Sequence, residues 1–530
     1  MRLNGRRTLS ALLVMVSIFL LIPNLTMAEA NAKELEYAYL DADASFLIRG
    51  EKVKITAVVP DTKGLTFEFT LFRSEDRAAK KEFEYVTKQK KSKKNVFEFT
   101  PKKLGQYYLE VWIYDKEHRS KKINSEVFYA YEPEDRKDVT KLPGKVLSIV
   151  EEAKAQNFET EYDAALWLHD WLTHNAYYDE PMTIHTPEGV LLQGTGVCES
   201  YALAYHMLLH EYGIDSVYAT GYSRGELHAW DLVKIDGEWT YVDATWNDPA
   251  GGTDAVSGKE GYDYFGMNDA LMSRDHDWTY GNVNIPPKAE TLKHNYLLKN
   301  GAKPFSSEEE LYALLSEELT NKEPKINYTY HGDDKYFDVS YLIERWMKSN
   351  NRKFFVDTYQ WGGSKFSGNM SVTYKDMEGY DTFVDEAEFT QKVEEMVKSK
   401  PASIKMAYVG DDNYFDCGIF IRKWLDKNAR RLFISNYSYT YYPFSVDITA
   451  EYKDVEGYTF FKDDAELAAA LQNILDTKAT EMKLYYTGDD NFYNLKWKVD
   501  DWLRENRDDI KNVGGVGYTG TDADLTLEWN

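Results

Sequence analysis

Apolar and polar residues follow three different patterns along the 530-residue chain. Between residues 31 and 132 they alternate in short runs, such as EKVKITAVVP and GQYYLEVWIYD, that are separated by turn residues. Alternation with a period of two in such short runs is typical of a β-sandwich. We therefore predict an all-β domain here, with the basic run from Lys88 to Lys94 in an exposed loop.

From about residue 135 the period lengthens. Apolar residues recur every three or four positions in KVLSIVEEAKAQ (145–156) and TEYDAALWLHDWLTHNAYYDE (160–180), as in amphipathic helices. A third predicted helix begins at Cys198 and ends at Gly213. Two alternating runs, ELHAWDLVKI and GEWTYVDATW, then meet at Asp236-Gly237, a dipeptide typical of tight β-hairpins. These elements predict an α+β domain.

Beyond about residue 300 the chain repeats itself. Phe305, Phe383 and Phe461 lie 78 residues apart, and the same interval separates three Gly-Asp-Asp triplets. Each copy is predicted to hold a helix, a strand, a second helix and two further strands. A unit of this length can bury a modest core, so we predict three tandem α+β domains. The triplet is interpreted as a turn and helix cap, or else as a cation site, although no twelve-residue calcium loop follows.

Charge and the N-terminal segment limit the classes of function. The formal net charge of −25 disfavours nucleic-acid binding. The chain begins MRLNGRR, continues with an apolar run from Ala11 to Ile22, and then has small residues. This pattern predicts a signal peptide over 1–30, and the run is short for a membrane anchor, which is the alternative. We expect a secreted or cell-surface protein with no membrane span after cleavage.

The chain has only two cysteines, which excludes a disulfide framework. Cys198 follows Gly194-Thr195-Gly196-Val197 and opens the third predicted helix. A thiol in the first turn of a helix lies near the positive end of the helix dipole and near free N–H groups, which favour the thiolate. Cys198 is therefore a candidate nucleophile. Cys417 matches Val339 and Leu495 in the other copies, which indicates packing.

The hairpin supplies two candidate partners. With a two-residue turn at Asp236-Gly237, Ile235 pairs with Glu238, and counting outward places His228 opposite Thr245. Asp243 is then a diagonal neighbour of His228 on the same face, within reach of a hydrogen bond. The spacing thus allows Asp243 to orient His228, as the acid of a catalytic triad does.

Three separated motifs, Gly-x-Gly-Val-Cys, His-Ala-Trp and Val-Asp-x-Thr-Trp, occur in this order between about residues 140 and 250. In them the chain resembles the transglutaminase-like superfamily, which is related to papain-type cysteine peptidases. The resemblance implies that Cys198 is the nucleophile, His228 the general base and acid, and Asp243 the orienting carboxylate. It further implies acyl transfer through a thioester, without a cofactor.

Acyl transfer also requires stabilisation of an oxyanion. The backbone N–H of Cys198 is the natural first donor. Gln193, Tyr177 and Tyr178 are candidates for a second donor, or they only pack around the cleft. Trp230 shares the face of His228 and is a candidate wall of the cleft.

The other tryptophan and the remaining histidines are given structural roles. Trp246 is expected to pack in the core. In HDWLTH the histidines are five residues apart, and in YHMLLH the pair His206 and His210 lacks an adjacent glutamate. No metal ligands are therefore predicted.

The predicted organisation combines these interpretations. The stretch GQYYLEVWIYD resembles the final strands of immunoglobulin-like domains. We predict a signal peptide (1–30), an immunoglobulin-like β-sandwich (31–132), a transglutaminase-like catalytic domain (135–290) and three repeats (300–377, 378–455 and 456–530).

The predicted function is that of a secreted, bacterial-type thiol acyl-transfer enzyme, a cysteine peptidase or amidase acting on peptide or isopeptide bonds. One alternative is a transglutaminase that cross-links proteins. Another is a non-catalytic surface or scaffold protein. The expected partners are a protein or peptide substrate and, through the repeats, a cell-wall or surface polymer.

Overall fold

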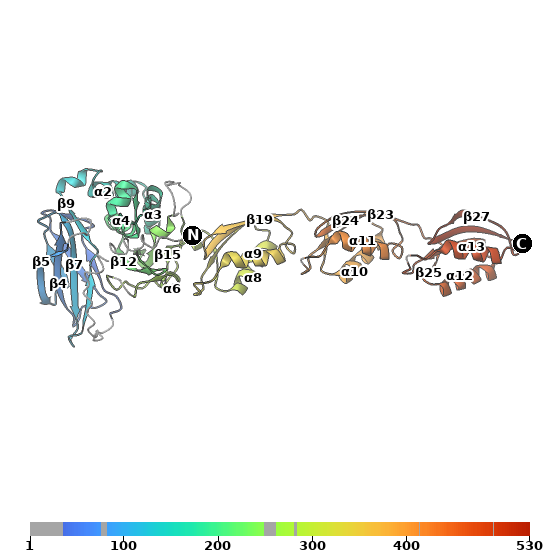
Figure 1. Ribbon diagram of the computed structural model, residues 1–530, viewed down its shortest axis with the longest axis horizontal. Helices are drawn as coiled ribbons and strands as arrows, with labels where there is room; N and C mark the ends of the chain where they lie inside the picture. The colour runs from blue at the N-terminus through green and yellow to red at the C-terminus, as the bar shows by residue number, and fades with distance from the viewer. Residues whose placement is uncertain (1–34, 76–81, 249–260, 280–282, 413, 491) are drawn as a thin grey trace, which may run out of the picture. The chain divides into compact units, whose positions relative to one another are not determined.

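A computed structural model describes residues 35–75, 82–248, 261–279, 283–412, 414–490 and 492–530 (Figure 1). The predicted signal peptide lies outside the described residues. Contacts divide the chain into two compact units. The first holds Met1–Leu314, Ile326–Val339 and Gly362–Asn369, and the second holds Leu315–Lys325, Ser340–Trp361 and Met370–Asn530. Three segments of the first repeat, 300–314, 326–339 and 362–369, thus belong to the same unit as the residues before it. In the part of the chain that is described, no helix has both the length and the apolar character needed to cross a bilayer.

The N-terminal region is all β. Its strands form one sheet of order β1-β3-β6 and another of order β2-β9-β7-β4-β5, with β8 beside β7. Alternate side chains, among them Phe67, Phe69 and Leu109, fill a core. The strands are β1 (Tyr39–Ala42), β2 (Leu47–Ile48), β3 (Val53–Val58), β4 (Thr66–Ser74), β5 (Glu84–Ser92), β6 (Val96–Phe99), β7 (Gly105–Tyr114), β8 (Ser120–Asn124) and β9 (Phe128–Tyr131). The immunoglobulin-like relationship stays a prediction.

The predicted basic loop is wrong. Lys88 and the lysines that follow it lie mostly within β5, a strand at the edge of its sheet. Exposed lysines on an edge strand oppose pairing with another chain, which accounts for a charged sequence in a strand.

The central region packs helices on a five-stranded antiparallel sheet of order β15-β14-β13-β12-β16. Helix α4 (Cys198–Tyr212) lies against β12 and β13, with α2 and α3 beside it. Its inner side chains Tyr205, Leu208 and Leu209 are fully buried. The remaining elements are η1 (Pro133–Lys137), α2 (Leu142–Ala155), α3 (Glu161–Asn175), β10 (Tyr177–Tyr178), η2 (Gly189–Gln193), β11 (Thr195–Gly196), β12 (Ser216–Ser223), β13 (Glu226–Ile235), β14 (Glu238–Val242), α5 (Ala244–Asn247), β15 (Phe265–Met267), α6 (Asp269–Met272), β16 (His276–Asp277) and α7 (Tyr296–Lys299).

The hairpin forms at the predicted turn but is shorter than predicted. Asp236 and Gly237 have φ angles of 49° and 83°, as a tight type I′ turn requires, and Ile235 pairs with Glu238. The pairing ends at Val242, because the next residues turn into α5. The predicted pairing of His228 with Thr245 is therefore wrong: the partner of His228 is Gly221 of β12.

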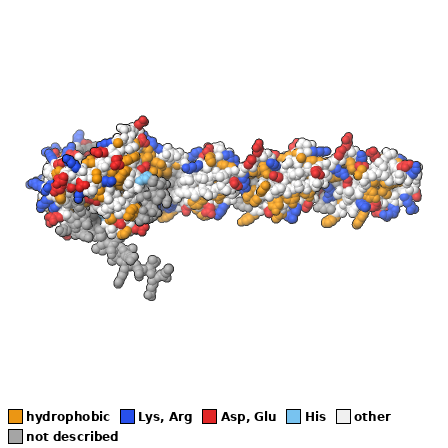
Figure 2. Space-filling view, turned by 90° about the horizontal axis from the view of Figure 1, so that it is seen from above, with side chains coloured by type: hydrophobic (Ala, Val, Ile, Leu, Met, Phe, Trp, Pro, Cys, Tyr) orange, Lys and Arg blue, Asp and Glu red, His pale blue; other side chains and the backbone are white. Residues whose placement is uncertain are grey.

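The three copies share one order of elements, which includes a short leading strand that was not predicted. In the second copy the sheet has the order β21-β22-β24-β23, in the third it has the order β25-β26-β28-β27, and both helices of each copy lie on one side of it (Figure 1). Acidic and basic side chains are both spread over the face shown in Figure 2. The elements are β17 (Lys303–Phe305), α8 (Glu308–Thr320), β18 (Lys325–Tyr330), α9 (Val339–Asn350), β19 (Val356–Gly363), β20 (Ser367–Tyr374); β21 (Asp381–Phe383), α10 (Glu386–Met396), η3 (Val397–Ser399), β22 (Ser403–Tyr408), α11 (Cys417–Asn428), β23 (Ile434–Tyr442), β24 (Ser445–Tyr452); β25 (Thr459–Phe461), α12 (Asp464–Thr477), β26 (Glu481–Tyr486), α13 (Leu495–Glu505), β27 (Ile510–Tyr518) and β28 (Asp522–Trp529).

The Gly-Asp-Asp triplets form turns. In the second copy Asp412 Oδ1 accepts the N–H of Tyr414 at 2.8 Å. A Cβ on Gly410 would lie 2.3 Å from the hydroxyl of Tyr408, so only glycine fits. The predicted cap is wrong in detail, because Asp416, outside the triplet, caps α11.

These turns also receive an arginine from the preceding copy. Arg352 Nη1 donates to the carbonyl of Asp412 at 2.7 Å, and Arg430 Nη1 donates to that of Asp490 at 3.0 Å. Both pairs lie within the second compact unit. The triplets therefore join neighbouring copies, a role that spacing alone does not reveal.

Candidate active site

Cys198 is the first residue of α4 and is 3% exposed. The chain reaches it through β11, which pairs in parallel with β10 and places Tyr178 beside Gly196. A Cβ on Gly196 would lie 2.5 Å from the Cβ of Ser200, so glycine is required for this close approach. The first N–H groups of a helix have no partners within it, and they surround the sulfur with positive potential.

His228 and Asp243 are in direct contact. The distance between His228 Nε2 and Asp243 Oδ2 is 2.6 Å, and the two side chains are 8% and 0% exposed. The other oxygen of Asp243, Oδ1, accepts the N–H of Trp246 at 3.0 Å and so caps α5. The turn into α5 thus fixes the carboxylate against the imidazole.

Cys198 and His228 line the same small cavity, of about 60 Å³. Since Asp243 occupies Nε2 of His228, the other ring nitrogen, Nδ1, is the one available to the sulfur. Burial lowers the pKa of His228, but the charges of Asp243 and Cys198 and hydrogen bonds to both raise it, and the net effect is a pKa of about 10. This environment favours the imidazolium form of His228 beside the carboxylate of Asp243.

The pKa of Asp243 shifts the other way. Burial alone would raise it, but the charge and hydrogen bond of His228, together with those of His276, hold the pKa of Asp243 well below its usual range. The carboxylate is therefore ionised at neutral pH.

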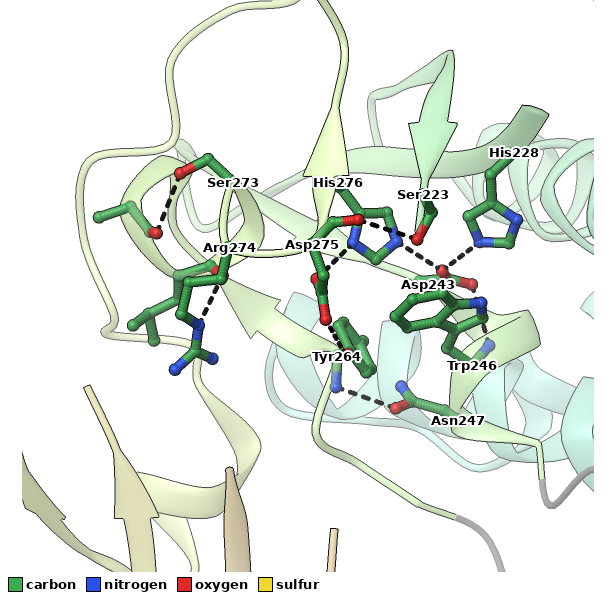
Figure 3. A network of polar contacts seen from close by, with 12 residues as sticks. Ser223, His228, Asp243, Trp246, Asn247, Tyr264, Ser273, Arg274, Asp275 and His276 are labelled. Carbon is green, nitrogen blue, oxygen red and sulfur yellow. Dashed lines mark hydrogen bonds and ion pairs between the residues drawn. The ribbon is translucent and has the colours of Figure 1, made fainter. Parts of the chain in front are cut away.

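His276 is a fourth residue of the site, beside Cys198, His228 and Asp243, and it was not predicted from the sequence. Its Nε2 lies 3.1 Å from Asp243 Oδ2, and its Nδ1 lies 2.8 Å from Asp275 Oδ1 (Figure 3). The hydroxyl of Tyr264 donates to Asp275 Oδ2 at 2.7 Å. His276 lies 33 residues beyond Asp243, outside the recognised motifs, and no local spacing points to it.

Ligand atoms of His228, Asp243 and His276 lie within 4.8 Å of one another, close enough for a metal ion. These residues are far apart in sequence, and no metal site was predicted from them. Hydrogen bonds account for the contacts that both histidines make with Asp243, so the group forms a hydrogen-bond network centred on this carboxylate.

A larger cleft of about 560 Å³ is also lined by His228. Tyr178 and Trp246 line it, and Arg224 stacks over the Trp246 ring at 4.2 Å. The first repeat contributes Phe366 and its neighbours to the same cleft. These segments all belong to the first compact unit.

The structure separates the remaining candidates. Tyr178 lines the large cleft, and burial followed by the charge of Cys198 raises its pKa well above its usual value. Tyr177, its neighbour in β10, is 37% exposed. Gln193 is exposed and lines a different depression, which Cys198 and His228 do not reach.

The two tryptophans differ in how they meet their expected roles: Trp246 packs against a core cluster, as predicted, and also lines the cleft, whereas the role predicted for Trp230 is wrong. Trp230 is 1% exposed and packs in a core cluster behind His228, with ring centroids 5.8 Å apart. It does not wall the cleft. Trp246 lines the cleft and is only partly buried.

Residues 151–244, which contain Cys198, His228 and Asp243 but not His276, match the sequence model of the Transglutaminase-like superfamily. This segment belongs to the transglutaminase-like superfamily. The kyphoscoliosis peptidases of Mus musculus and Homo sapiens are 28% and 27% identical to the chain over 134 residues, which cover 21% of this chain. The match spans only 20% of the length of either relative.

The matches among solved structures include a TGase and a structure described as a cysteine protease from Cytophaga hutchinsonii. The first is 15% identical, covers 22% of this chain and 33% of its own, and has a TM-score of 0.19. The second is 17% identical, covers 41% and 69%, and has a TM-score of 0.18.

Proposed function

We propose that the chain is a thiol acyl-transfer enzyme that acts on peptide or isopeptide amides through Cys198, His228 and Asp243. The observation that carries the proposal is geometric. Cys198 and His228 line one small cavity, and Nε2 of His228 lies 2.6 Å from the buried carboxylate of Asp243. A non-catalytic scaffold has no need of this arrangement.

The chemistry follows from these positions. The thiolate of Cys198 attacks the amide carbonyl, and a C–S bond forms as the carbonyl π electrons move to oxygen. When the oxyanion collapses, the C–N bond breaks and His228 gives its proton to the leaving amine. Water or a second amine then attacks the thioester, His228 takes its proton, and the thiolate leaves.

Two donors are assigned to the oxyanion. One is the backbone N–H of Cys198, in the first turn of α4. The other is the hydroxyl of Tyr178, whose pKa is raised by burial and by the charge of Cys198. Donors fixed in place before reaction stabilise the developing charge without reorganisation. Tyr177 and Gln193 are not assigned this role.

Hydrolysis is the proposed main reaction. The curated relatives that share about a fifth of their length with this chain are named peptidases. With a glutamine-containing peptide and a labelled primary amine, we expect the free acid as the main product, resolved from the labelled amide by mass spectrometry. Cys198→Ala serves as the control. A product that is mainly the labelled amide would instead assign a cross-linking transglutaminase.

A reagent that needs no substrate tests the scaffold alternative. Iodoacetamide is expected to alkylate Cys198 rapidly well below pH 8, and to do so much more slowly in a His228→Ala variant. Labelling of Cys198 at the rate of an ordinary free thiol would favour the scaffold.

We also propose that the protein is exported and that its repeats hold it on a surface polymer. An exposed aromatic side chain recurs 78 residues apart at the Gly-Asp-Asp turns, where Tyr336, Tyr414 and Phe492 are 76%, 95% and 95% exposed. Aromatic faces exposed at regular intervals suit stacking on a repetitive polymer, and three weak sites together lengthen residence.

This attachment is tested with isolated cell-wall polysaccharide. Alanine at Tyr336, Tyr414 and Phe492 together is expected to reduce co-sedimentation of the full chain with the polymer at least tenfold. Alanine at Tyr85, which is 63% exposed in the N-terminal region, is the matched control. Equal binding of all variants would contradict the proposal.

A further inference from the structure

We propose that His276 is a positioning residue for the proposed acyl-transfer reaction. It holds Asp243 in the orientation in which this carboxylate orients His228. The proposal rests on the proposed function, and it concerns a residue outside the three recognised motifs.

Both ring nitrogens of His276 face carboxylates. Nε2 lies 3.1 Å from Asp243 Oδ2, the same oxygen that His228 contacts, and Nδ1 lies 2.8 Å from Asp275 Oδ1. An ionised carboxylate only accepts hydrogen bonds, so Nε2 of His276 is placed to donate to Asp243. His276 therefore bridges two acids, and Asp243 is held between two imidazoles.

The carboxylate of Asp243 has no freedom to rotate in this arrangement. Its Oδ2 meets His228 and His276, while its Oδ1 accepts the N–H of Trp246. Loss of the His276 contact would leave an oxygen of a fully buried carboxylate with one donor fewer. A buried carboxylate with fewer donors turns away or binds a proton, and either change reduces the negative charge that faces His228.

His276 is itself held in place. It is 1% exposed, and the rings of Trp246 and Trp230 lie 4.6 Å and 4.9 Å from its own. Asp275 is tied by the hydroxyl of Tyr264 at 2.7 Å, and its carbonyl accepts the hydroxyl of Ser223 at 3.0 Å (Figure 3).

The segment that carries His276 is also anchored to the first repeat. Arg274 Nη1 donates to the carbonyl of Tyr330 at 2.7 Å, and its guanidinium lies 4.2 Å from the centre of the Phe366 ring. All three residues belong to the first compact unit. The first repeat thus holds Arg274, two positions before His276. Through the intervening Asp275 it supports the ring of His276.

The pH test requires the charged neighbours of this network to be known. The described titratable or charged groups that face it come from the elements packed around it. They are Tyr178 on β10, Cys198 on α4, Arg224 after β12, His228 and Asp231 on β13, Tyr264 before β15, and Asp275 before β16.

The experiment compares two conservative variants. His276→Gln can keep a donor at the position of Nε2, toward Asp243, whereas His276→Asn can keep one at the position of Nδ1, toward Asp275. The rate of Cys198 alkylation by iodoacetamide is measured from pH 4 to 9 on the full chain, by mass spectrometry of the digest. Cys417, which is fully buried and whose thiol pKa burial raises to about 12, is the internal control in the same sample.

The midpoint is the pH at which Cys198 alkylation reaches half of its maximal rate. We expect His276→Gln to keep the wild-type midpoint. His276→Asn should move the midpoint upward by about one pH unit, which makes alkylation about tenfold slower on the acidic side. Equal midpoints in all three proteins would assign His276 a purely structural role. A wild-type midpoint that shifts on addition of EDTA would also overturn the proposal, because a metal ion would then hold the cluster.

The readout separates this proposal from the proposed function. Alkylation needs no substrate, so the midpoints test His276 even if no amide is cleaved, whereas product analysis tests the reaction itself. Should His276→Asn not fold by circular dichroism, Asp275→Asn removes the charge that anchors His276 and is expected to raise the midpoint in the same direction. An unchanged midpoint in a folded Asp275→Asn protein would then refute the proposal.

Discussion

Replacing Cys198 by alanine is expected to abolish amide hydrolysis and amine transfer, with a loss of roughly 10⁶-fold in kcat. No other thiol lies in the described part of the site, because Cys417 belongs to a different compact unit. Without the sulfur neither the thioester nor its breakdown can occur. The decisive measurement is the kcat with a fluorogenic peptide, together with mass spectrometry of the acid-quenched enzyme.

Cys417→Val is the matched control for this variant. Cys417 is fully buried, and Val339 and Leu495 occupy the matching buried positions in the other copies. Valine should therefore fit with little cost, and activity should stay within about twofold of the wild type. Residual activity of Cys198→Ala above a hundredth of the wild-type rate would contradict a thioester route.

The sequence predicted the helices and strands of the central domain better than it predicted the residues at which they end. Apolar periodicity located α2, α3 and α4, and Asp236-Gly237 identified the hairpin turn and its first pairs. It did not show that β14 stops at Val242, because the residues that follow could continue the alternation. Their entry into α5 depends on the cap that Asp243 provides for the N–H of Trp246, a local contact that the alternating pattern does not show.

The candidate site was predictable only as far as its motifs reach. Cys198, His228 and Asp243 lie within about 45 residues, in elements whose types could be predicted. His276 lies on β16, which forms an edge of the sheet. Its neighbour in the sheet is β12, a strand that is far from β16 in sequence. A contact that depends on strand order has no local signature.

Replacing Asp243 by asparagine is expected to reduce kcat/KM roughly 10⁴-fold. The amide removes the negative charge that stabilises the His228 imidazolium, and it can present an N–H where His228 Nε2 needs an acceptor. Asparagine also caps helices well, so the bond to Trp246 and the start of α5 are preserved. The measurement is kcat/KM with the fluorogenic peptide. A loss smaller than tenfold would remove Asp243 from the proposed triad.

The same substitution is expected to change how stability depends on pH. The lowered pKa of Asp243 gives stability that is present above its unfolded value near 4 and is lost as pH falls through the folded value. The pKa of His228 is raised to about 10, so its stabilisation is complete below its unfolded value near 6.5 and declines as pH rises toward 10. The pair therefore stabilises the wild type most between about pH 4 and 6.5.

The difference in unfolding free energy between wild type and Asp243→Asn should follow this window. Urea unfolding followed by tryptophan fluorescence is expected to show the largest difference near pH 5 to 6 and a much smaller one at pH 10. Asp243→Ala also removes the cap of α5, so it should cost about 1 kcal/mol more than asparagine at every pH. A pH-independent difference for the asparagine variant would mean that Asp243 is a cap and not the ionised partner of His228. The alanine and asparagine variants thus separate the two tasks of this carboxylate, one for each of its oxygens.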